Sequence, residues 1–343
     1  MTSVVPGSIG TVSRPGSELR VGVIGAGAMG EAHLRAYAST PGVRIVGLAT
    51  RTPERAAELA RRYEVEATFA DARALIDETR PDGVSVTTGE HDHVEPTCYA
   101  LERGVGVLVE KPIASSVADA ERIAETARTS GSVLLPGHIL RFTLPYRGLK
   151  AEVASGRIGE VIGIAARRDR PRAIAEHYRH VHPAFLTAVH DIDLALWLTG
   201  SRVIRVRALE HRQPGRPQPD IFWAQAVLAS GALATIATAY LLPGDGPLAT
   251  SDRIEVYGTE GIAVVDLSVP VLAVHAKPGP VVDWLIGPAD GSGAFGDEIA
   301  HFCACLRDGR PSNIVTINDA VAGIRIADAM VRSVAADGGD IWL

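Results

Sequence analysis

Cysteine is scarce in this sequence: the 343 residues contain only Cys98, Cys303 and Cys305. An odd and small number of cysteines does not build a disulfide framework. The pair Cys303 and Cys305 has no second set of ligands nearby, which a structural zinc site would require. We therefore expect buried thiols, no metal site, and a reducing, cytoplasmic setting.

The chain also lacks an excess of basic residues and any long apolar run. It has 34 lysines and arginines against 40 acidic residues, and a net charge of −6. This balance does not indicate nucleic acid or an anionic membrane as a partner. No apolar run reaches the roughly 18–20 residues that span a bilayer. The first 18 residues are rich in Ser, Gly and Pro without the apolar core of a signal peptide, so we expect a flexible leader over residues 1–18.

What the chain does contain is a regular alternation of strand and helix patterns up to about residue 138. Apolar runs that predict strands lie at Leu19–Gly25, Val43–Ala49, Gly83–Thr87, Val105–Val109 and Ser132–Leu135. Helical patterns lie between them, at Glu31–Ser39, Pro53–Tyr63, Pro96–Arg103 and Val117–Ser130. Strands joined through helices of this length pair in parallel. We predict an α/β fold with a doubly wound parallel sheet over residues 19–138.

The remaining residues, 139–343, have a different pattern. Short alternating stretches predict strands at Val161–Arg167, Val203–Glu210, Ile221–Ala229, Leu233–Ala239, Arg253–Gly258 and Ile262–Asp266. Turn residues separate many of them, which is typical of a mostly antiparallel sheet. Two helical patterns, 297–306 and 318–335, follow. We predict a second, α+β domain over residues 139–343.

A glycine-rich loop follows the first predicted strand. Gly25, Gly27 and Gly30 have the spacing of a dinucleotide fingerprint, with Ala28 and Met29 between the last two. In that motif the glycines allow a tight turn, a close approach to pyrophosphate and close helix packing. The position between a strand and a helix is the one that the mechanism requires. We predict dinucleotide binding; the alternative is a purely structural turn.

The end of the second predicted strand bears on the choice of dinucleotide. NAD-binding chains usually place Asp or Glu there to hold the ribose hydroxyls. This chain has Thr50 and Arg51 instead. Thr50 can hydrogen-bond a phosphate, and Arg51 can pair with one and stack on adenine. The pattern favours NADP(H); the alternative is that Arg51 is a solvated residue at a helix start and the cofactor is NAD(H).

Five motifs give the chain a resemblance to a known family. They are GVIGAGAMGEAHLRA (22–36), TTGEHDHVEP (87–96), VLVEKPIA (107–114), RFTLPYRGLKAEVASGRIGEV (141–161) and HDIDLALWLTG (190–200). With them the chain resembles the glucose–fructose oxidoreductase, inositol dehydrogenase and rhizopine-catabolism family (Gfo/Idh/MocA), over nearly everything from Leu19 onward. The Glu-Lys-Pro element after a strand, Glu110 to Pro112, is its most specific part.

The resemblance implies an NAD(P)-dependent dehydrogenase or reductase that acts on CH–OH groups of sugars, cyclitols and related polyols. It implies that a polyol or keto-sugar binds under an open-faced sheet of the second domain. The same sheet is expected to form a homodimer or homotetramer, and the last helix to pack back toward the dinucleotide-binding domain. Thr88, His93, Glu110 and Lys111 are expected to lie around the cofactor.

Lys111 is the first candidate for catalysis. It follows a strand, and ligands of open α/β sheets bind at the carboxyl ends of the strands. An ammonium group there can polarise a carbonyl oxygen or hydrogen-bond an alcohol, while the cofactor carries the hydride. The alternative is a surface lysine at a strand end, with Glu110 as its solvated partner.

His190 is the second candidate, because it occupies the position of a substrate-facing histidine in the family. Inositol dehydrogenase-like members carry an aspartate four residues earlier, on the same helix face. Here that position is Leu186, so the usual lysine–aspartate–histidine arrangement is not available. Asp193 is expected to orient the His190 ring or to bond a backbone group. The alternative for His190 is a packing role beside a carboxylate.

Further substrate candidates are less specific. They are Arg141, Tyr178, His182 and Thr187. A basic stretch, Arg167, Arg168, Arg170, Arg172 and Arg179, either receives an anionic group of the substrate or forms a solvated loop.

Two function classes follow from these residues. The first is an NADP(H)-preferring oxidoreductase that interconverts an alcohol and a ketone. The second, motivated by Leu186, is a dinucleotide-binding sensor that kept the fold and lost turnover. A reductase of a non-sugar substrate, such as an imine or a dihydrodiol, is a further alternative, because function depends on the site and not on the fold.

Overall fold

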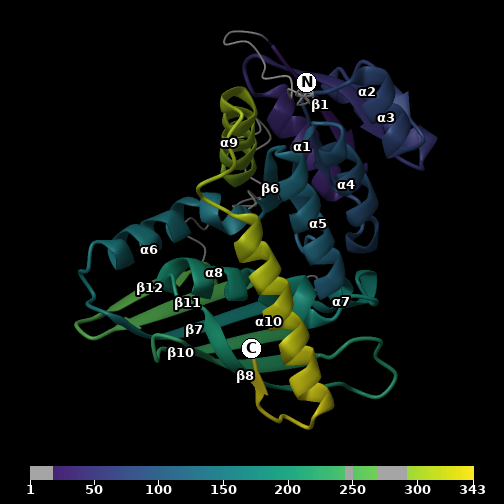
Figure 1. Ribbon diagram of the computed structural model, residues 1–343. Helices are drawn as coiled ribbons and strands as arrows, with labels where there is room; N and C mark the ends of the chain where they lie inside the picture. Colours follow the sequence, from purple (N-terminus) through teal and green to yellow (C-terminus); the bar gives the residue numbers. More distant parts are fainter. Residues whose placement is uncertain (1–17, 244–249, 269–291) are drawn as a thin grey trace, which may run out of the picture. The chain divides into compact units, whose positions relative to one another are not determined.

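The computed structural model describes residues 18–243, 250–268 and 292–343, which divide into two compact units (Figure 1). Within these ranges the first unit holds residues 18–113, 121–137 and 292–317, and the second holds the others. The predicted leader lies outside the described residues up to residue 17. The predicted domain boundary after residue 138 stays a prediction. The observed grouping also assigns residues 292–317 to the first unit.

The first unit contains a six-stranded parallel sheet. Its strands are β1 (Leu19–Ile24), β2 (Val43–Ala49), β3 (Thr68–Phe69), β4 (Gly83–Val86), β5 (Gly106–Glu110) and β6 (Leu134–Gly137). They lie in the order β3-β2-β1-β4-β5-β6, so the order reverses beside β1. Every residue of β4 and β5 is buried, which explains their nearly unbroken apolar sequences. The doubly wound sheet predicted from the sequence is confirmed, and only the two-residue β3 was missed.

Six helices accompany this sheet. They are α1 (Ala28–Ala38), α2 (Pro53–Tyr63), α3 (Ala72–Thr79), α4 (Val94–Glu102), α5 (Val117–Ser130), which begins with residues grouped in the second unit, and α9 (Ala294–Asp308). A 3-10 turn, Glu90–Asp92, precedes α4. Helix α9 packs against α1 and buries Ile299, Phe302 and Leu306, which recur at helical spacing. A Cβ built on Gly83 would lie 2.6 Å from Leu306 Cδ1, so a glycine in β4 lets α9 approach the sheet closely.

The second unit contains a seven-stranded mixed sheet. Its strands are β7 (Val161–Pro171), β8 (Val203–His211), β9 (Ile221–Leu228), β10 (Leu233–Leu242), β11 (Ser251–Gly258), β12 (Ile262–Asp266) and β13 (Ile341–Trp342). The order is β12-β11-β7-β10-β9-β8-β13. The predicted mostly antiparallel sheet is confirmed. The parallel pair β7–β10 and the short β13 were not predicted, because partners far apart in sequence define them.

Helices of the second unit cover one face of this sheet. They are α6 (Leu144–Ala154), α7 (Arg172–His177), a π-helical turn at Ala184–Ala188 with α8 (Val189–Thr199), and α10 (Ile317–Ala335); a 3-10 turn, Ile139–Phe142, precedes α6. Helix α8 packs against β7 and β10. In β9 the residues Phe222, Ala224 and Ala226 are buried, while Trp223 and Gln225 are exposed. The alternation gives the sheet one covered and one open face.

The open face carries several large apolar side chains. Leu209 of β8 and Trp223 of β9 are paired directly across two strands, and both are more than half exposed. Leu233, Ile262 and Val264 are exposed on the same face, as the strand pairings require. An exposed apolar patch of this kind marks an interaction surface in many proteins.

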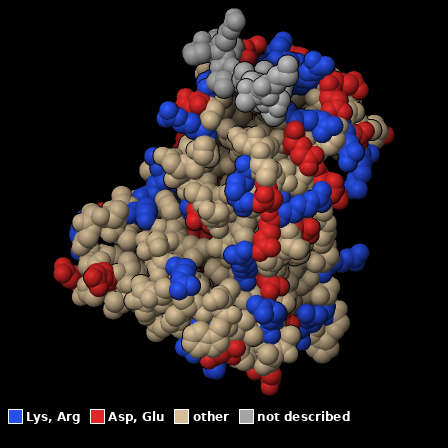
Figure 2. Space-filling view, in the orientation of Figure 1, with Lys and Arg blue, Asp and Glu red and all other residues tan. Residues whose placement is uncertain are grey.

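Two surface properties bear on partners. Among the described helices, none combines the length and the apolar character needed to cross a membrane. On the face drawn in Figure 2, basic and acidic side chains are interspersed over both units. Elsewhere among the described residues, exposed charges form ion pairs, such as Arg103 with Asp77 and Arg122 with Glu95. Charge of one sign therefore does not gather on this face.

Candidate functional site

The glycine loop lies between β1 and α1. Gly25 has φ 109°, a conformation that favours glycine, and a Cβ there would lie 2.7 Å from the Thr87 backbone. A Cβ on Gly30 would overlap the Gly25 carbonyl oxygen. A Cβ on Gly27, in contrast, would meet nothing within 4 Å. The first and third glycines are thus fixed by the protein itself, and the second leaves open space, as a bound pyrophosphate requires.

The start of α1 is available to a phosphate. The helix begins at Ala28, three residues earlier than predicted, with Gly27 as the N-cap. No side chain caps this end, so its first backbone N–H groups are not used by a capping side chain. Ala28 is exposed and Met29 is half-buried. The predicted loop residues therefore fit a dinucleotide at the helix N-terminus.

Thr50 and Arg51 lie directly after β2. The Thr50 backbone N–H donates to the Phe69 carbonyl, and its hydroxyl accepts from the Thr52 N–H at 3.3 Å. The Arg51 side chain is 88% exposed and lies 3.4 Å from Asp92. An exposed ion pair of this kind is weak. Arg51 can therefore reorient toward a ligand at this edge of the sheet.

Glu110 ends β5 and is buried within a chain of hydrogen bonds. Its Oε1 lies 3.2 Å from His33 Nε2, and its Oε2 accepts from the Lys111 backbone N–H at 3.1 Å. His33 Nδ1 in turn lies 2.9 Å from Ser85 Oγ, which bonds the Tyr37 hydroxyl at 2.8 Å. Burial alone would raise the pKa of Glu110, but His33 and the Lys111 charge outweigh it and lower the pKa. Glu110 is thus an ionised carboxylate that fixes the backbone at Lys111.

Lys111 is half-buried, and a cis peptide bond joins it to the buried Pro112. It follows β5 directly, so its backbone lies at the carboxyl edge of the sheet, as does the glycine loop after β1. β4, which separates these two strands, pairs with both in parallel. Within the first unit the structure therefore brings Lys111 to the same sheet edge as the predicted dinucleotide loop.

His93 is a predicted cofactor residue that the structure places inside the protein. Its Nδ1 lies 2.9 Å from the Pro112 carbonyl and its Nε2 lies 3.0 Å from the Thr88 carbonyl. The Thr88 hydroxyl donates to the Asp92 carbonyl at 3.1 Å. Burial lowers the pKa of His93 despite these backbone partners. His93 thereby links the loop after β4 to the loop after Lys111.

In the second unit, His190 lies in the first turn of α8 and is half-buried. The π-helical turn at Ala184–Ala188 precedes it, although the apolar spacing of Leu186, Val189, Ile192 and Leu196 predicts a regular helix. The wider turn rotates the preceding residues around the axis. Leu186 lies within this turn, is half-buried and is not part of the core.

Arg141 and Asp193, two predicted substrate residues, contact each other. Arg141 Nε and Nη2 donate to the two Asp193 oxygens at 3.0 and 2.7 Å, and Nη1 donates to Asp319 at 3.1 Å. His138 Nδ1 lies 3.6 Å from Asp193 Oδ1. Arg141, Asp193 and His138 are all buried. This cluster ties α8 to the segment that follows β6 and to the start of α10.

The other predicted substrate residues are spread over the same unit. The Thr187 hydroxyl lies 2.6 Å from the Tyr240 hydroxyl, and burial raises the pKa of Tyr240 to about 12. His182 Nε2 lies 2.9 Å from Glu210, although burial still lowers the pKa of His182. Tyr178 follows α7 and packs its ring edge-on against His177. The structure brings Thr187 and Tyr240 together, whereas His182 bonds a different strand.

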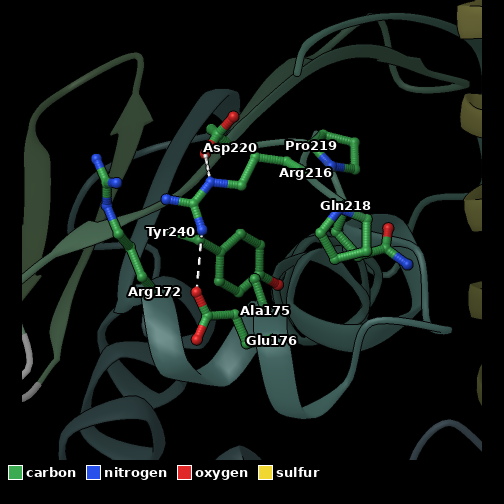
Figure 3. A pocket seen from close by; sticks show the side chains of 9 residues that line it. Arg172, Ala175, Glu176, Arg216, Gln218, Pro219, Asp220 and Tyr240 are labelled. Carbon is green, nitrogen blue, oxygen red and sulfur yellow. Dashed lines mark hydrogen bonds and ion pairs between the residues drawn. The ribbon is translucent and has the colours of Figure 1, made fainter. Parts of the chain in front are cut away.

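A small pocket lies between α7 and the connection from β8 to β9 (Figure 3). Arg172 and Glu176 of α7 line it, with Arg216, Asp220 and the Tyr240 ring. Arg216 lies 2.9 Å from Glu176 and 3.9 Å from Asp220. Arg216 therefore faces two carboxylates, which offset its charge in the pocket wall.

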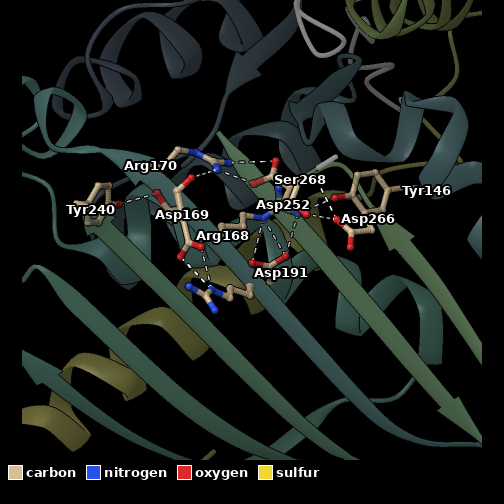
Figure 4. A network of polar contacts seen from close by, with 11 residues as sticks. Tyr146, Arg168, Asp169, Arg170, Asp191, Tyr240, Asp252, Asp266 and Ser268 are labelled. Carbon is tan, nitrogen blue, oxygen red and sulfur yellow. Dashed lines mark hydrogen bonds and ion pairs between the residues drawn. The ribbon is translucent and has the colours of Figure 1, made fainter. Parts of the chain in front are cut away.

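The basic stretch, for which an anion site and a solvated loop were the alternatives, pairs three of its arginines with acids (Figure 4). Arg168 is buried and lies 2.9 Å from both Asp191 and Asp252. Arg170 also pairs with Asp252, and Arg167 pairs with Asp169 on the open face. The carboxyl of Asp191 has a pKa raised by burial even beside Arg168. This network anchors α8 to β7 and β11 through Asp191, the residue next to His190.

Comparison with known proteins gives two family matches. Residues 19–138 match the model described as "Oxidoreductase family, NAD-binding Rossmann fold", and residues 146–264 match "GFO/IDH/MocA C-terminal domain". The chain is 32% identical over 220 residues to an inositol 2-dehydrogenase of Pseudomonas fluorescens, covering 63% of this chain and 65% of that one. It thus spans a little under two thirds of that relative's length.

Two further similarities extend over nearly the whole chain. A scyllo-inositol 2-dehydrogenase (NAD(+)) of Bacillus subtilis is 27% identical over 330 residues, covering 92% of this chain and 94% of that one. The structure of a scyllo-inositol dehydrogenase from Lactobacillus casei, with bound NAD(H) and scyllo-inositol, has a TM-score of 0.82 at 20% identity. It covers 95% of this chain and 99% of that chain, so the two share a fold.

Proposed function

Because the chain belongs to the Gfo/Idh/MocA family of oxidoreductases, whose first unit binds a nicotinamide dinucleotide, we propose that it interconverts an alcohol and a ketone on a cyclitol, sugar or related polyol. The observation that carries the proposal is the position of Lys111. It lies at the carboxyl edge of the parallel sheet that also presents the glycine loop. The inositol dehydrogenases among its relatives support a polyol as the substrate class.

The proposed chemistry assigns proton handling to the protein. The bound dinucleotide supplies the hydride acceptor or donor. In oxidation the hydroxyl proton passes to the neutral amine of Lys111 as the carbon loses hydride; in reduction the Lys111 ammonium returns a proton to the oxygen. Glu110 holds the Lys111 backbone through the bond described above. We assign His190 to a second position at the reacting hydroxyl, in place of the aspartate that Leu186 replaces.

A substrate panel tests this function. The purified protein is mixed with NAD(H) or NADP(H) and with inositols, aldoses, keto-sugars and their derivatives, and nicotinamide absorbance is followed. Turnover of at least one polyol or keto-sugar is expected. Tight dinucleotide binding without turnover of any compound would favour a sensor, the reading that Leu186 motivates. Turnover of an imine or dihydrodiol alone would assign the chain to that chemistry instead.

We propose NADP(H) as the preferred cofactor because Thr50 and Arg51 stand where NAD enzymes carry an acid. Replacing Arg51 with alanine is expected to lower kcat/KM for NADPH by about tenfold or more, since a charge-assisted bond to the 2′-phosphate is lost. The value for NADH is expected to change little. Arg61→Ala, an exposed arginine on α2, is the matched control. A wild-type preference for NADH that Arg51→Ala leaves unaltered would contradict this assignment.

We also propose that the open face of the second sheet forms a homo-oligomer. Trp223 is 60% exposed at the middle of this apolar face. Its replacement by aspartate is expected to shift the protein to a smaller species in sedimentation velocity, because a buried, unpaired charge opposes association. Leu144→Asp, at a site 80% exposed on α6, is the matched control. A monomeric wild-type protein, or a Trp223→Asp oligomer of unchanged size, would refute the proposal.

A further inference from the structure

Glu298 of α9 is a buried acid that the proposed reaction does not use. The residue is 0% exposed, and neither carboxyl oxygen has a hydrogen-bond partner among the described residues. It belongs to the buried stripe of α9, between Phe295 and Phe302. An ionised carboxylate is too costly to bury without partners, so a group in this position favours its neutral form.

A chain of hydrogen bonds leads from Tyr37 to Glu110. The Tyr37 and Ser85 hydroxyls share a bond of 2.8 Å, Ser85 Oγ lies 2.9 Å from His33 Nδ1, and His33 Nε2 lies 3.2 Å from Glu110 Oε1. The Lys111 N–H donates to the other Glu110 oxygen. One Glu110 oxygen thus accepts from a backbone N–H and the other contacts an imidazole nitrogen, and an ionised carboxylate can accept at both.

Helix α9 reaches the Glu110 network, because Phe295, one turn before Glu298, packs edge-on against the His33 ring with centroids 5.5 Å apart, and His33 contacts Glu110. Burial, and then the negative charge of Glu110, raise the pKa of Glu298 well above its ordinary value. Two like charges in one buried region are unfavourable, so such a pair takes up one proton. The positive charge of Lys111 lowers the pKa of Glu110 and so favours its ionised form.

The titratable groups of this region come from three elements. Helix α1 contributes His33 and Tyr37, and the end of β5 contributes Glu110 and Lys111. Helix α9 contributes Glu298 and Cys303. A Cys303 thiolate would raise the pKa of Tyr37, and the charge of Arg307 lowers the pKa of Cys303. Burial raises the pKa of Cys303 to about 12 and that of Tyr37 well above its ordinary value, so both stay neutral over the working range. Among the α9 groups named here, Glu298 is thus the one whose titration changes the charge near Glu110.

We propose that Glu298 and Glu110 form a buried pair with one proton and one negative charge. Glu298 carries the proton, and the Glu110 carboxylate accepts the hydrogen bond from the Lys111 backbone N–H. Glu298 is then a positioning residue: it keeps a single carboxylate beside the lysine at neutral pH. When alkaline pH removes its proton, a second negative charge arises near Lys111. The inference deepens the proposed function, because it concerns the lysine assigned to proton transfer.

Lysine scarcity makes a direct test possible. The sequence contains only three lysines, Lys111, Lys150 and Lys277. Protein labelled with ¹³Cε-lysine therefore gives few NMR signals. The variants Lys150→Arg and Lys277→Arg assign each signal to its residue. The Lys111 signal is followed from about pH 6 to about pH 10 in wild type, Glu298→Gln, Glu110→Gln and Asp297→Asn. Asp297 is the exposed acid next to Glu298 and is the matched control. Infrared spectra record the carbonyl band of a protonated carboxyl group over the same range.

At neutral pH Glu298→Gln and Asp297→Asn are expected to leave the Lys111 signal unchanged, whereas Glu110→Gln moves its titration to lower pH by about one unit or more. Wild type shows a second, alkaline step in the Lys111 signal together with loss of the infrared band. Glu298→Gln lacks both. A Glu298→Gln titration that moves as far as that of Glu110→Gln, or a wild type without the band at pH 7, overturns the proposal.

These measurements use no substrate. If every compound in the panel fails to turn over, the proposed function fails, while the state of the acid pair is still decided by the spectra. Should Glu298→Gln not fold, the wild-type titration decides the question. The infrared band must disappear over the same pH range in which the alkaline step of the Lys111 signal occurs. If the band persists through the alkaline step, or no such step occurs, Glu298 is not coupled to Lys111.

Discussion

Replacing Lys111 with methionine is expected to lower kcat by about 10²- to 10⁴-fold, the usual contribution of a positioned proton donor or acceptor. Methionine preserves much of the side-chain length and cannot exchange a proton. Affinity for the dinucleotide, measured by fluorescence titration, is expected to change far less, because we assign binding of the pyrophosphate to the glycine loop and the start of α1. Single-turnover kinetics then separate the loss in chemistry from any loss in binding.

The variant Lys111→Arg distinguishes two roles for the same charge. Arginine keeps the positive charge but does not release a proton in the working pH range. If Lys111 transfers a proton, Lys111→Arg is nearly as slow as Lys111→Met. Recovery of most of the activity in Lys111→Arg would show that the charge suffices. A Lys111→Met enzyme with wild-type kcat would remove Lys111 from the chemistry altogether.

Replacing Arg168 with methionine is expected to lower the free energy of unfolding by about 3–5 kcal/mol, measured by urea denaturation. Arg168 is buried between Asp191 and Asp252, so its removal leaves buried carboxylates with less compensation. Arg167→Met is the matched control. Arg167 is the preceding residue on the opposite face of β7, its side chain is 67% exposed, and its pair with Asp169 contributes about 0–1 kcal/mol.

The stability loss in Arg168→Met is expected to depend on pH. Burial already raises the pKa of Asp191 while Arg168 opposes it, and without Arg168 that rise is larger. A carboxyl group whose pKa is higher in the folded than in the unfolded state binds more protons when folded. Stability therefore falls as pH rises above the unfolded value near 4. The defect should be smaller at pH 5 than at pH 7. Equal losses for Arg167→Met and Arg168→Met would contradict this account of the network.

The sequence was most informative where local geometry decides the residue. Gly25 must adopt a positive φ, and Gly30 must lack a side chain, so the glycine loop could be located without any tertiary contact. The parallel sheet followed from continuous apolar strands separated by helices. The π-helical turn before His190 could not be inferred in this way, because the apolar spacing there fits an ordinary helix.

The basic stretch shows why charged strands are difficult to predict. The predicted strand ended at Arg167, whereas β7 continues to Pro171. Arg168 can lie inside because Asp191 and Asp252, far away in the sequence, supply its partners. The alternation of Arg167 outward and Arg168 inward does follow the strand period of two, and that period was the available signal. Glu298 had a comparable signal, since it falls within the apolar stripe of its helix.

The way α9 completes the first unit has a consequence for how the protein is made. The ribosome delivers β1 to β6 first and α9 only after more than 150 further residues. Until then, the surface of β4 at Gly83 lacks Leu306, which packs there in the finished protein. Apolar surface of the nascent first unit therefore stays uncovered while β7 to β12 of the second sheet are synthesised. Such an interval is when a chaperone would be most useful to this chain.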